Sequence, residues 1–257
     1  MRYATDVQTA LITGASSGIG LELAKLFAAD GIATILVARE SERLREAAAN
    51  LKARALPADL TDLNAPEQIF ESLKTERIDY LVNNAGFGLG GELAKTDRRT
   101  ELEMIQVNIT ALYDLTKLFL PGMLTRGAGR IMNVASTAAF QPGPLMAVYY
   151  ASKAFVLSFS EAVAEELTGT GVTVTTLCPG PTASDFQRRA GIEKTKMVKG
   201  KALGMMTSEE AARIGYRGMM DGKVIVIPGL LNRLGVQSLR LGPRAIVRKA
   251  AKKLQET

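Results

Sequence analysis

The sequence predicts a single α/β domain built on a doubly wound parallel sheet of about seven strands, with helices on both faces. Two observations support this prediction. Short β-branched apolar runs alternate with longer segments of helical period along nearly the whole chain, and such a repeat folds into right-handed crossovers between parallel strands. The 257 residues are 47% hydrophobic and show no linker or internal repeat, so the chain can bury one large core.

Strands are expected where β-branched and apolar residues cluster, and helices where apolar residues recur with a helical period. Local signals mark several ends: Asp30-Gly31 closes the first helix, and Thr207 to Glu210 forms a capping box at the start of another. The expected strands span 9–13, 32–38, 54–58, 78–83, 129–135, 172–178 and 223–227. The expected helices span about 18–29, 41–52, 65–76, 97–124, 149–168 and 208–221.

The composition excludes several kinds of chemistry. The chain has no His, which excludes a Ser-His-Asp triad, an HExxH zinc site and acid–base catalysis by imidazole. The single cysteine, Cys178, cannot form an internal disulfide and suits a reducing cytoplasm. No apolar run is long enough to span a membrane, and the N-terminal segment lacks the pattern of a signal peptide. We therefore expect a cytoplasmic protein without a metal site.

A glycine-rich turn follows the first strand. Residues 13–20 read TGASSGIG, and an apolar-periodic helix begins at once. Gly14 would allow the sharp turn, Gly18 a close approach of backbone to a ligand, and Gly20 close packing of helix and strand. Free N–H groups and the positive end of the helix dipole suit a pyrophosphate. The spacing is GxxxGxG rather than GxGxxG, so a tight turn without a ligand stays an alternative to a Rossmann-type dinucleotide site.

The end of the second strand indicates which dinucleotide would bind. An NAD-preferring site usually places an acid there to accept hydrogen bonds from the ribose. This sequence has Ala38 at that place, and Arg39 follows with a guanidinium suited to a 2′-phosphate. The missing acid and the added arginine together predict NADP(H). A solvated arginine at a helix start is the alternative.

Tyr149 and Lys153 stand four residues apart at the start of a predicted helix, so they share one face, with Cβ atoms ~5–6 Å apart. A phenol has a pKa of about 10, and lowering it by ~3 units requires ~4 kcal/mol. An ammonium at ~4 Å supplies roughly 1 kcal/mol in water and about 4 at an effective dielectric constant of 20. Lys153 can therefore activate Tyr149 only where the pair is partly desolvated.

Two further polar residues occupy unusual places. Ser136 lies just past the strand expected over 129–135, at the sheet edge where parallel sheets bind ligands. Asn108 lies inside a predicted helix, an unfavourable place unless its side chain has a task. Each residue alone has an ordinary structural interpretation. Their joint occurrence behind a glycine turn points to a catalytic site.

These motifs together resemble the short-chain dehydrogenase/reductase family, with the match running from about Thr9 to Phe186. TGASSGIG is similar to the cofactor turn of the family, Asn83-Asn84-Ala85-Gly86 to its NNAG segment, and Pro179-Gly180 to its PG turn. The resemblance implies a catalytic tetrad of Asn108, Ser136, Tyr149 and Lys153. The cofactor-binding residues that it implies, together with those argued above, are Gly14, Ser16, Ser17, Gly18, Ile19, Gly20, Arg39, Asp59, Leu60, Asn84, Tyr149, Lys153, Pro179, Gly180 and Thr182.

The resemblance also implies a mechanism. Tyr149 would give a proton to a carbonyl oxygen during reduction, or take one from an alcohol during oxidation, while Ser136 hydrogen-bonds that oxygen. Lys153 would lower the pKa of Tyr149 and bind the nicotinamide ribose, and Asn108 would anchor a water of the proton relay. Asp59 would read the adenine amino group. The hydride is the chemistry of the cofactor.

Three positions depart from the family pattern. Ser17 stands where NADP-preferring members carry a basic residue, so Arg39 alone supports that cofactor. Ser184 replaces the threonine of the PGxxxT motif and keeps a hydroxyl. Tyr150 adjoins Tyr149 and is also within reach of Lys153, but the family pattern Y-x-A-S-K selects Tyr149.

The last quarter of the chain is strongly basic. Residues 188–257 carry 16 Lys and Arg against 5 Asp and Glu, within a net charge of +6 for the whole chain. Nucleic acid is not expected as a partner, because Tyr216 is the single aromatic residue after Phe186 and offers no stacking platform. Attraction of an acidic substrate, such as an acyl thioester carrier, is another interpretation.

Residues 187–222 follow the PG turn, at the place where a substrate lid would sit. Met197, Met205 and Met206 suit an adaptable apolar pocket, and a surface loop over packed methionines is the alternative.

Residues 234–257 form a basic extension after this segment. Its last part is predicted to be a helix, with an apolar stripe of Ile246, Val247, Ala250 and Leu254. We expect the helix to dock on its own domain or on a sister subunit. An anionic membrane surface is the alternative.

The leading hypothesis is an NADP(H)-dependent carbonyl reductase or alcohol dehydrogenase for an apolar small molecule, active as a homodimer or homotetramer. A 3-oxoacyl thioester reductase is the second hypothesis, although the segment KVIVIPGLLNRLG lacks the Gly-Gly ending associated with those enzymes. A non-catalytic NADPH sensor is the third, and the intact Asn–Ser–Tyr–Lys set argues against it.

Overall fold

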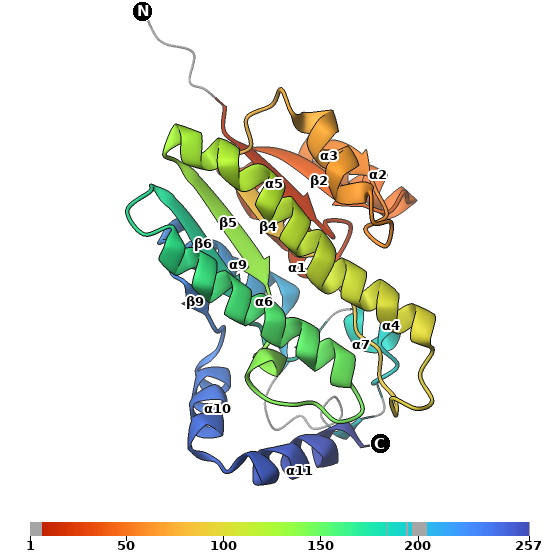
Figure 1. Ribbon diagram of the computed structural model, residues 1–257. Helices are drawn as coiled ribbons and strands as arrows, with labels where there is room; N and C mark the ends of the chain where they lie inside the picture. The colour runs from red at the N-terminus through yellow and green to blue at the C-terminus, as the bar shows by residue number, and fades with distance from the viewer. Residues whose placement is uncertain (1–6, 184, 194, 197–204, 257) are drawn as a thin grey trace, which may run out of the picture.

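A parallel sheet of seven strands runs through the middle of the molecule, in the order β3-β2-β1-β4-β5-β6-β9 (Figure 1). The structure is a computed structural model that describes residues 7–183, 185–193, 195–196 and 205–256. All neighbouring strands of the sheet pair in parallel, which confirms the predicted fold class. The strands are β1 (Thr9–Thr13), β2 (Ala33–Ala38), β3 (Arg54–Pro57), β4 (Tyr80–Asn83), β5 (Gly129–Val134), β6 (Val172–Leu177) and β9 (Ile225–Val226).

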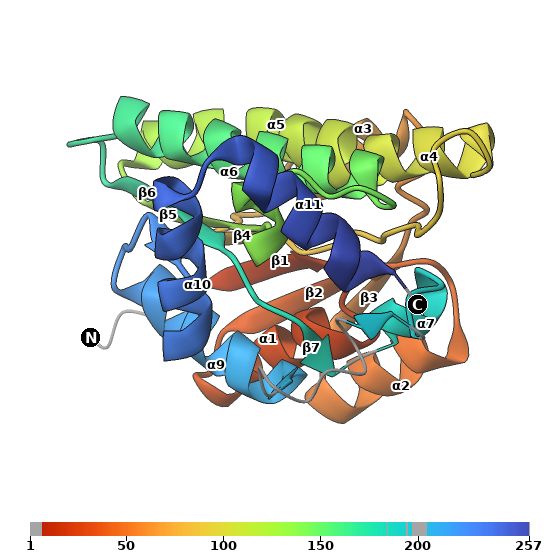
Figure 2. The same cartoon turned by 90° about the horizontal axis from the view of Figure 1, so that it is seen from below.

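Helices cover both faces of the sheet (Figure 2). Alternate strand residues point to opposite faces: in β1, Ala10 and Ile12 belong to one core cluster and Leu11 to the other. One face is covered by α1 (Gly18–Ala29), α2 (Glu42–Leu51) and α9 (Ser208–Met220). The other is covered by α3 (Ala65–Leu73), α5 (Ala111–Arg126) and α6 (Ala147–Glu166).

The single helix expected over 97–124 is divided into three parts. α4 (Arg98–Ile105) and α5 are separated by a π-helical turn, η1 (Gln106–Thr110). π-helical turns are rare in proteins, and those that do occur often lie at functional sites. Asn108 lies in it with a fully buried side chain, so the irregularity coincides with the residue that helix propensity disfavours there.

The segment predicted as a substrate lid, 187–222, consists of two different parts. Its second half contains α9, which packs into the core against α1 and begins with the expected capping box at Thr207. This half is a structural helix rather than a lid. The first half contains α7 (Phe186–Arg189), and β7 (Thr182–Ala183) pairs with β8 (Met206–Thr207) just before α9. Ser184, residue 194 and residues 197–204, Met197 among them, lie outside the described residues, so the lid stays a prediction for the first half.

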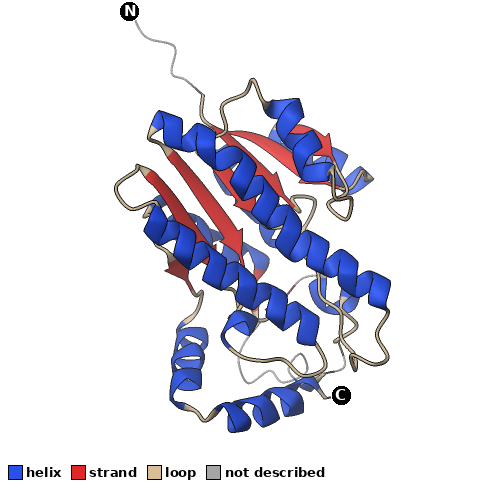
Figure 3. Cartoon of the chain, viewed as in Figure 1, coloured by secondary structure: helices blue, strands red, loops and turns tan. Residues whose placement is uncertain are grey.

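The basic extension forms two helices, α10 (Leu230–Leu241) and α11 (Arg244–Gln255). Both lie beyond the carboxyl ends of the strands, toward the viewer in Figure 2, and Figure 3 shows them apart from the two helix layers. The predicted apolar stripe of α11 is wrong in part. Val247 is buried together with Ala251 and Gln255, because positions four residues apart face the domain, whereas the other three stripe residues, Ile246, Ala250 and Leu254, are exposed.

Candidate active site

The turn after β1 is held by the segment that follows β4. The Thr13 hydroxyl accepts hydrogen bonds from the backbone N–H groups of Asn84 (3.0 Å) and Ala85 (3.0 Å). The Nδ2 of Asn84 donates to the carbonyl oxygens of Thr13 (2.9 Å) and Gly14 (3.2 Å). The NNAG segment therefore fixes the glycine turn to the switch point between β1 and β4, where open parallel sheets bind ligands.

The glycines of this turn have the conformation and the space that the motif requires. Gly14 (φ +65°) and Gly18 (φ +59°) are left-handed, which glycine tolerates without strain. A Cβ on Gly20 would collide with the Gly14 carbonyl and the Asn84 side chain. The Ser17 side chain does not cap α1, so the first N–H groups of this helix can serve an anion. Three further residues of the turn are half-buried: Ser16, Ser17 and Ile19.

The ends of β2 and β3 carry the residues expected near an adenosine. Arg39 follows β2 and is exposed, and it makes no hydrogen bond or ion pair with any described residue. Asp59 is exposed two residues after β3, and its Oδ1 accepts hydrogen bonds from the N–H (3.0 Å) and the hydroxyl (2.9 Å) of Thr61. Leu60 beside it is buried. These residues and the glycine turn lie along one edge of the sheet.

Ser136 joins the end of β5 to the PG turn. The backbone N–H of Thr137 donates to the Pro179 carbonyl (2.9 Å), and the Ser136 hydroxyl donates to the same oxygen (3.4 Å). Ser136 precedes a single turn of helix, η2 (Thr137–Phe140), whose Ala138 N–H donates to its Oγ (3.1 Å). These contacts place the Ser136 hydroxyl beside the PG turn, and the Thr182 hydroxyl donates to the Gly180 carbonyl there (3.0 Å).

Tyr149 and Lys153 share one face at the start of α6, as their spacing predicts. Both are buried, with 9% and 5% of their surface exposed. The Nζ of Lys153 lies 5.9 Å from the centroid of the Tyr149 ring and donates to the Val134 carbonyl (2.8 Å). A hydrogen bond joins the side chains of Tyr149 and Ser136. Tyr149 and Lys153 therefore converge at the end of β5 with Ser136, which lies 13 residues before Tyr149.

Burial dominates the electrostatics of this group. It raises the pKa of Tyr149 above its ordinary value, and the hydrogen bond with Ser136 acts in the opposite direction. Burial also lowers the pKa of Lys153 to about 8, because it disfavours the charged ammonium. The net shift of the pKa of Tyr149 is upward in this arrangement, and its lowering by Lys153 stays a prediction. The Lys153 ammonium is bound to the Val134 carbonyl oxygen, and burial is the largest effect on the pKa of the Tyr149 phenol.

The Asn108 side chain forms hydrogen bonds with the backbone of the segment that follows β4. Its Oδ1 accepts a hydrogen bond from the Phe87 N–H (3.1 Å), and its Nδ2 donates to the Phe87 carbonyl (3.0 Å) and to the Ser152 hydroxyl (3.0 Å). Both amide donors are thus used within the protein. Asn108 therefore clamps the Phe87 backbone to α6, next to Lys153. The relay water that the family resemblance implies stays a prediction.

A buried series of hydrogen-bonded polar side chains holds together the two strands, β4 and β5, that carry this site. The Nδ2 of Asn83 donates to the hydroxyl of Thr116 (3.0 Å) and to the Oδ1 of Asn133 (2.9 Å). Asn133 in turn donates to the Ser160 hydroxyl (2.9 Å). This series of hydrogen bonds runs from α5 through β4 and β5 to α6. It links the strand before the NNAG segment to the strand before Ser136.

The apolar residues around Tyr149 are absent from the motif-based predictions. The Tyr149 ring lies 5.2 Å from the ring of Phe186 in α7. A Cβ on Gly88 would lie 2.7 Å from the Phe186 ring and 3.2 Å from Met146, so only glycine fits there. The closely spaced glycines after the NNAG segment are therefore the sequence signal that could have indicated the packing of Phe186 and Met146 against this segment. The cluster around Tyr149 also includes Leu89, Met104, Ala138, Ala190 and Ile192.

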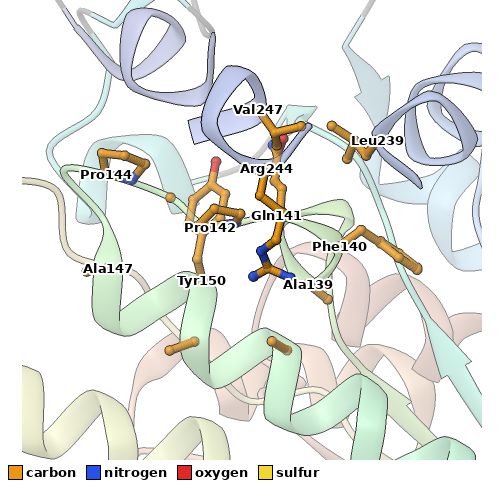
Figure 4. A pocket seen from close by; sticks show the side chains of 13 residues that line it. Ala139, Phe140, Gln141, Pro142, Pro144, Ala147, Tyr150, Leu239, Arg244 and Val247 are labelled. Atoms are coloured by element: carbon orange, nitrogen blue, oxygen red, sulfur yellow. The ribbon is translucent and has the colours of Figure 1, made fainter. Parts of the chain in front are cut away.

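A cavity of about 580 Å³ lies beside Tyr150, between α6 and the C-terminal helices (Figure 4). Its lining includes Tyr150 and Arg244 but neither Tyr149 nor Ser136. The Tyr150 hydroxyl accepts a hydrogen bond from the Nε2 of Gln255 in α11 (2.7 Å). The two adjacent tyrosines therefore have different surroundings: Tyr149 contacts Ser136 and Phe186, and Tyr150 holds α11.

The described residues hold neither a cluster of metal-binding side chains nor a membrane-spanning helix. No three His, Cys, Asp or Glu side chains of this part of the chain are grouped so that they could bind a metal ion. None of the described helices has the length and apolar character needed to span a membrane.

A family model described as short chain dehydrogenase matches residues 8–195. The chain belongs to the short-chain dehydrogenase family. The match includes the glycine turn, the NNAG segment, the convergent Ser–Tyr–Lys group and the PG turn. This short-chain dehydrogenase is therefore an oxidoreductase, and the resemblance noted from its motifs is confirmed.

Individual relatives extend the match. Ketoacyl reductase HetN of Nostoc sp. is 34% identical over 180 residues, which are 67% of this chain and 63% of that protein. A solved short-chain dehydrogenase from Sphingobium yanoikuyae in complex with NADPH has a TM-score of 0.81 and 33% identity, covering 95% of this chain and 98% of that chain. The bulky-bulky ketone specific alcohol dehydrogenase from Comamonas testosteroni has a TM-score of 0.78 and 28% identity, covering 96% and 97%.

Proposed function

We propose that this short-chain dehydrogenase uses NADP(H) to interconvert a ketone or aldehyde and the corresponding alcohol on an apolar small molecule, with Tyr149 as proton donor and acceptor. The observation that carries the proposal is the convergence of Tyr149, Ser136 and Lys153 within a buried apolar cluster. Hydroxyl groups held in this way can orient a carbonyl oxygen and give it a proton.

Each residue of the group has a separate task in this proposal. Tyr149 keeps its proton at neutral pH because burial raises its pKa, so it can donate that proton to the substrate oxygen during reduction. Ser136 hydrogen-bonds the same oxygen and fixes the carbonyl carbon. The Lys153 ammonium stabilises the phenolate left behind on Tyr149, and the reverse transfer returns the proton from an alcohol. The bound cofactor supplies or accepts the hydride.

The residues proposed to bind NADP(H) follow the sheet edge from β1 to the PG turn. The open N–H groups of α1 and the glycine turn fit the pyrophosphate, and the exposed Arg39 fits the 2′-phosphate. The NADPH complex of the Sphingobium relative supports this assignment. The proposed set is Gly14, Ser16, Ser17, Gly18, Ile19, Gly20, Arg39, Asp59, Leu60, Asn84, Tyr149, Lys153, Pro179, Gly180 and Thr182.

A 3-oxoacyl thioester is the second candidate substrate, because the Nostoc relative is named a ketoacyl reductase. A thioester would still present its keto group to the same three side chains. A non-catalytic NADPH sensor is disfavoured, since nucleotide binding alone does not require Ser136, Tyr149 and Lys153 to converge away from the glycine turn.

An NADPH-oxidation assay against apolar ketones, aldehydes and 3-oxoacyl thioesters tests the proposal. We expect saturable turnover of ketones or aldehydes. Tyr149→Phe should lower kcat/KM by about 10²–10⁴-fold, while Tyr150→Phe, the matched control, keeps most of the activity. The reverse pattern would contradict the assignment of Tyr149. Turnover of thioesters alone selects the second candidate, and NADPH binding without turnover of any substrate selects the sensor.

We also propose that the protein is a cytoplasmic homo-oligomer, a dimer or a tetramer. Tyr113 of α5 and Phe155 of α6 are 41% and 40% exposed, and Phe155 stacks on Phe159 with the ring centroids 5.8 Å apart. Such an aromatic patch suits a subunit interface. Burial raises the pKa of the Cys178 thiol to about 12, and a lone inert thiol suits a reducing compartment. Light scattering after size exclusion tests the oligomer, and a monomer would contradict it.

A further inference from the structure

The helices α10 and α11 carry large apolar side chains on the outside of the molecule. Their inner faces pack against the rest of the domain through residues such as Val236 and Val247, whose surfaces are 3% and 9% exposed. Five other large residues of the two helices, with 44% to 70% of their surface exposed, are Leu230, Leu231, Leu234, Ile246 and Leu254. Single exposed apolar residues are ordinary, whereas a group of them marks an interaction surface.

The same segment is entirely cationic. Between residues 230 and 255 the sequence has seven Lys and Arg residues and no Asp or Glu. On α11 the cations Arg248, Lys249, Lys252 and Lys253 are exposed, and none of them forms an ion pair within the described part of the chain. The charge of these four side chains of α11 is therefore not balanced by an ion pair with any described residue.

The apolar and cationic residues of α11 are ordered around the helix. Ile246, Ala250 and Leu254 follow one another at intervals of four, so they form one stripe along the surface. Lys249 and Lys253 border that stripe. A helix of this kind lies in the headgroup region of a bilayer, with the apolar stripe inserted and the long lysine stems reaching to the lipid phosphates.

The two helices lie together at one end of the molecule, beyond the carboxyl ends of the strands (Figures 1 and 2). α10 also touches the candidate active site, because a Cβ on Gly180 of the PG turn would lie 2.5 Å from the Oδ1 of Asn232. The exposed surface of α10 and α11 is therefore next to the end of the sheet at which the substrate would bind.

We propose that α10 and α11 form a docking surface for an anionic lipid bilayer, in which their exposed leucines and Ile246 insert while the flanking Lys and Arg residues bind the lipid phosphates. A second copy of the same surface is a poor partner, because the exposed cations of one copy would face those of the other. The apolar side chains project from the helices, which suits insertion into acyl chains. The proposal does not depend on the oxidoreductase activity.

Co-sedimentation of the full chain with vesicles tests the proposal. The vesicles are phosphatidylcholine with and without phosphatidylglycerol, each in low and in high salt. We expect binding to the anionic vesicles in low salt, weakened by salt because surface charges are screened, and little binding to pure phosphatidylcholine. Absence of binding to anionic vesicles in low salt overturns the proposal, as does retention on polyglutamate without any vesicle binding, which would point to an acidic macromolecule.

Two sets of variants separate the apolar and the cationic contributions. One triple variant replaces three leucines of α10 by Gln: Leu230, Leu231 and Leu234. The other replaces three lysines of α11 by Gln: Lys249, Lys252 and Lys253. Each variant should weaken vesicle binding at least about tenfold. The matched controls replace exposed residues elsewhere: Leu63, Leu93 and Leu102 by Gln in one, and Arg98, Lys117 and Arg213 by Gln in the other. Equal losses in variants and controls would overturn the assignment to α10 and α11.

The chain has no Trp, so a single introduced indole reports insertion without background. In Leu231→Trp, anionic vesicles should shift the emission to the blue and make it sensitive to brominated lipids. Leu63→Trp is the control, because Leu63 is also exposed, on the loop before α3. Vesicle binding without a shift in Leu231→Trp would overturn insertion at this position.

Discussion

The nucleotide end of the sheet and the C-terminal helices use polar and apolar groups in opposite ways. Around the glycine turn, Thr13 and Asn84 direct their hydrogen bonds inward to neighbouring backbone, and any side chain at Gly20 would collide. On α10 and α11, leucines are exposed, and the four Lys and Arg residues from 248 to 253 form no ion pair with described residues. The conformation of the first region is fixed by contacts within the protein. The exposed surface of the second region is suited to contact with a partner.

The largest effect is expected from adding one methyl group to each region. Gly20→Ala should abolish NADPH binding, because the new Cβ displaces the Gly14 carbonyl and the Asn84 side chain. Gly235→Ala in α10 meets no atom within 4 Å and should stabilise the protein by about 0.5–1 kcal/mol, since alanine favours a helix interior. NADPH titration and urea unfolding measure the two effects. Tight NADPH binding by Gly20→Ala would break the comparison.

A smaller effect is expected at Arg39. Arg39→Gln removes the exposed guanidinium proposed to bind the 2′-phosphate, a charge-assisted contact of about 1.5–3 kcal/mol. The KM for NADPH should rise about 10–100-fold, while the KM for NADH changes little. Arg43→Gln is the control, because Arg43 already pairs with Asp185 at 2.9 Å. An equal rise for both cofactors in Arg39→Gln would remove the 2′-phosphate from the proposal.

The smallest effect separates the two adjacent tyrosines. Tyr150→Phe removes the acceptor of the Gln255 hydrogen bond and should lower the free energy of unfolding by about 1 kcal/mol without abolishing turnover. Gln255→Ala and the double variant complete a cycle that isolates the pair. Additive losses of stability would show that this bond does not attach α11.

The comparison also explains what could be predicted from the sequence. The parallel sheet follows from the alternation of strand and helix patterns, and the placement of Ser136 after a strand and of Tyr149 and Lys153 on one helix face follows from their spacing. The π-helical turn at Asn108 escapes a 3.6-residue period, since it adds one residue where a side chain must reach Phe87. The stripe predicted for α11 is wrong in part, because Val247 faces the domain while Ile246, Ala250 and Leu254 are exposed. Its amphipathic pattern is real, but the pattern cannot distinguish an inner surface from one covered by an outside partner.

The pH dependence of carbonyl reduction tests most directly the claim that a neutral Tyr149 donates the proton beside a charged Lys153. Because burial lowers the pKa of Lys153 to about 8, its ammonium is present below that pH and is lost above it. The kcat/KM for reduction should therefore be level from pH 6 and fall about tenfold per unit above pH 8. Lys153→Arg, which stays charged, should lose this fall in whatever activity remains. A level profile to pH 10 in the wild-type protein, or the same fall in Lys153→Arg, would contradict the account.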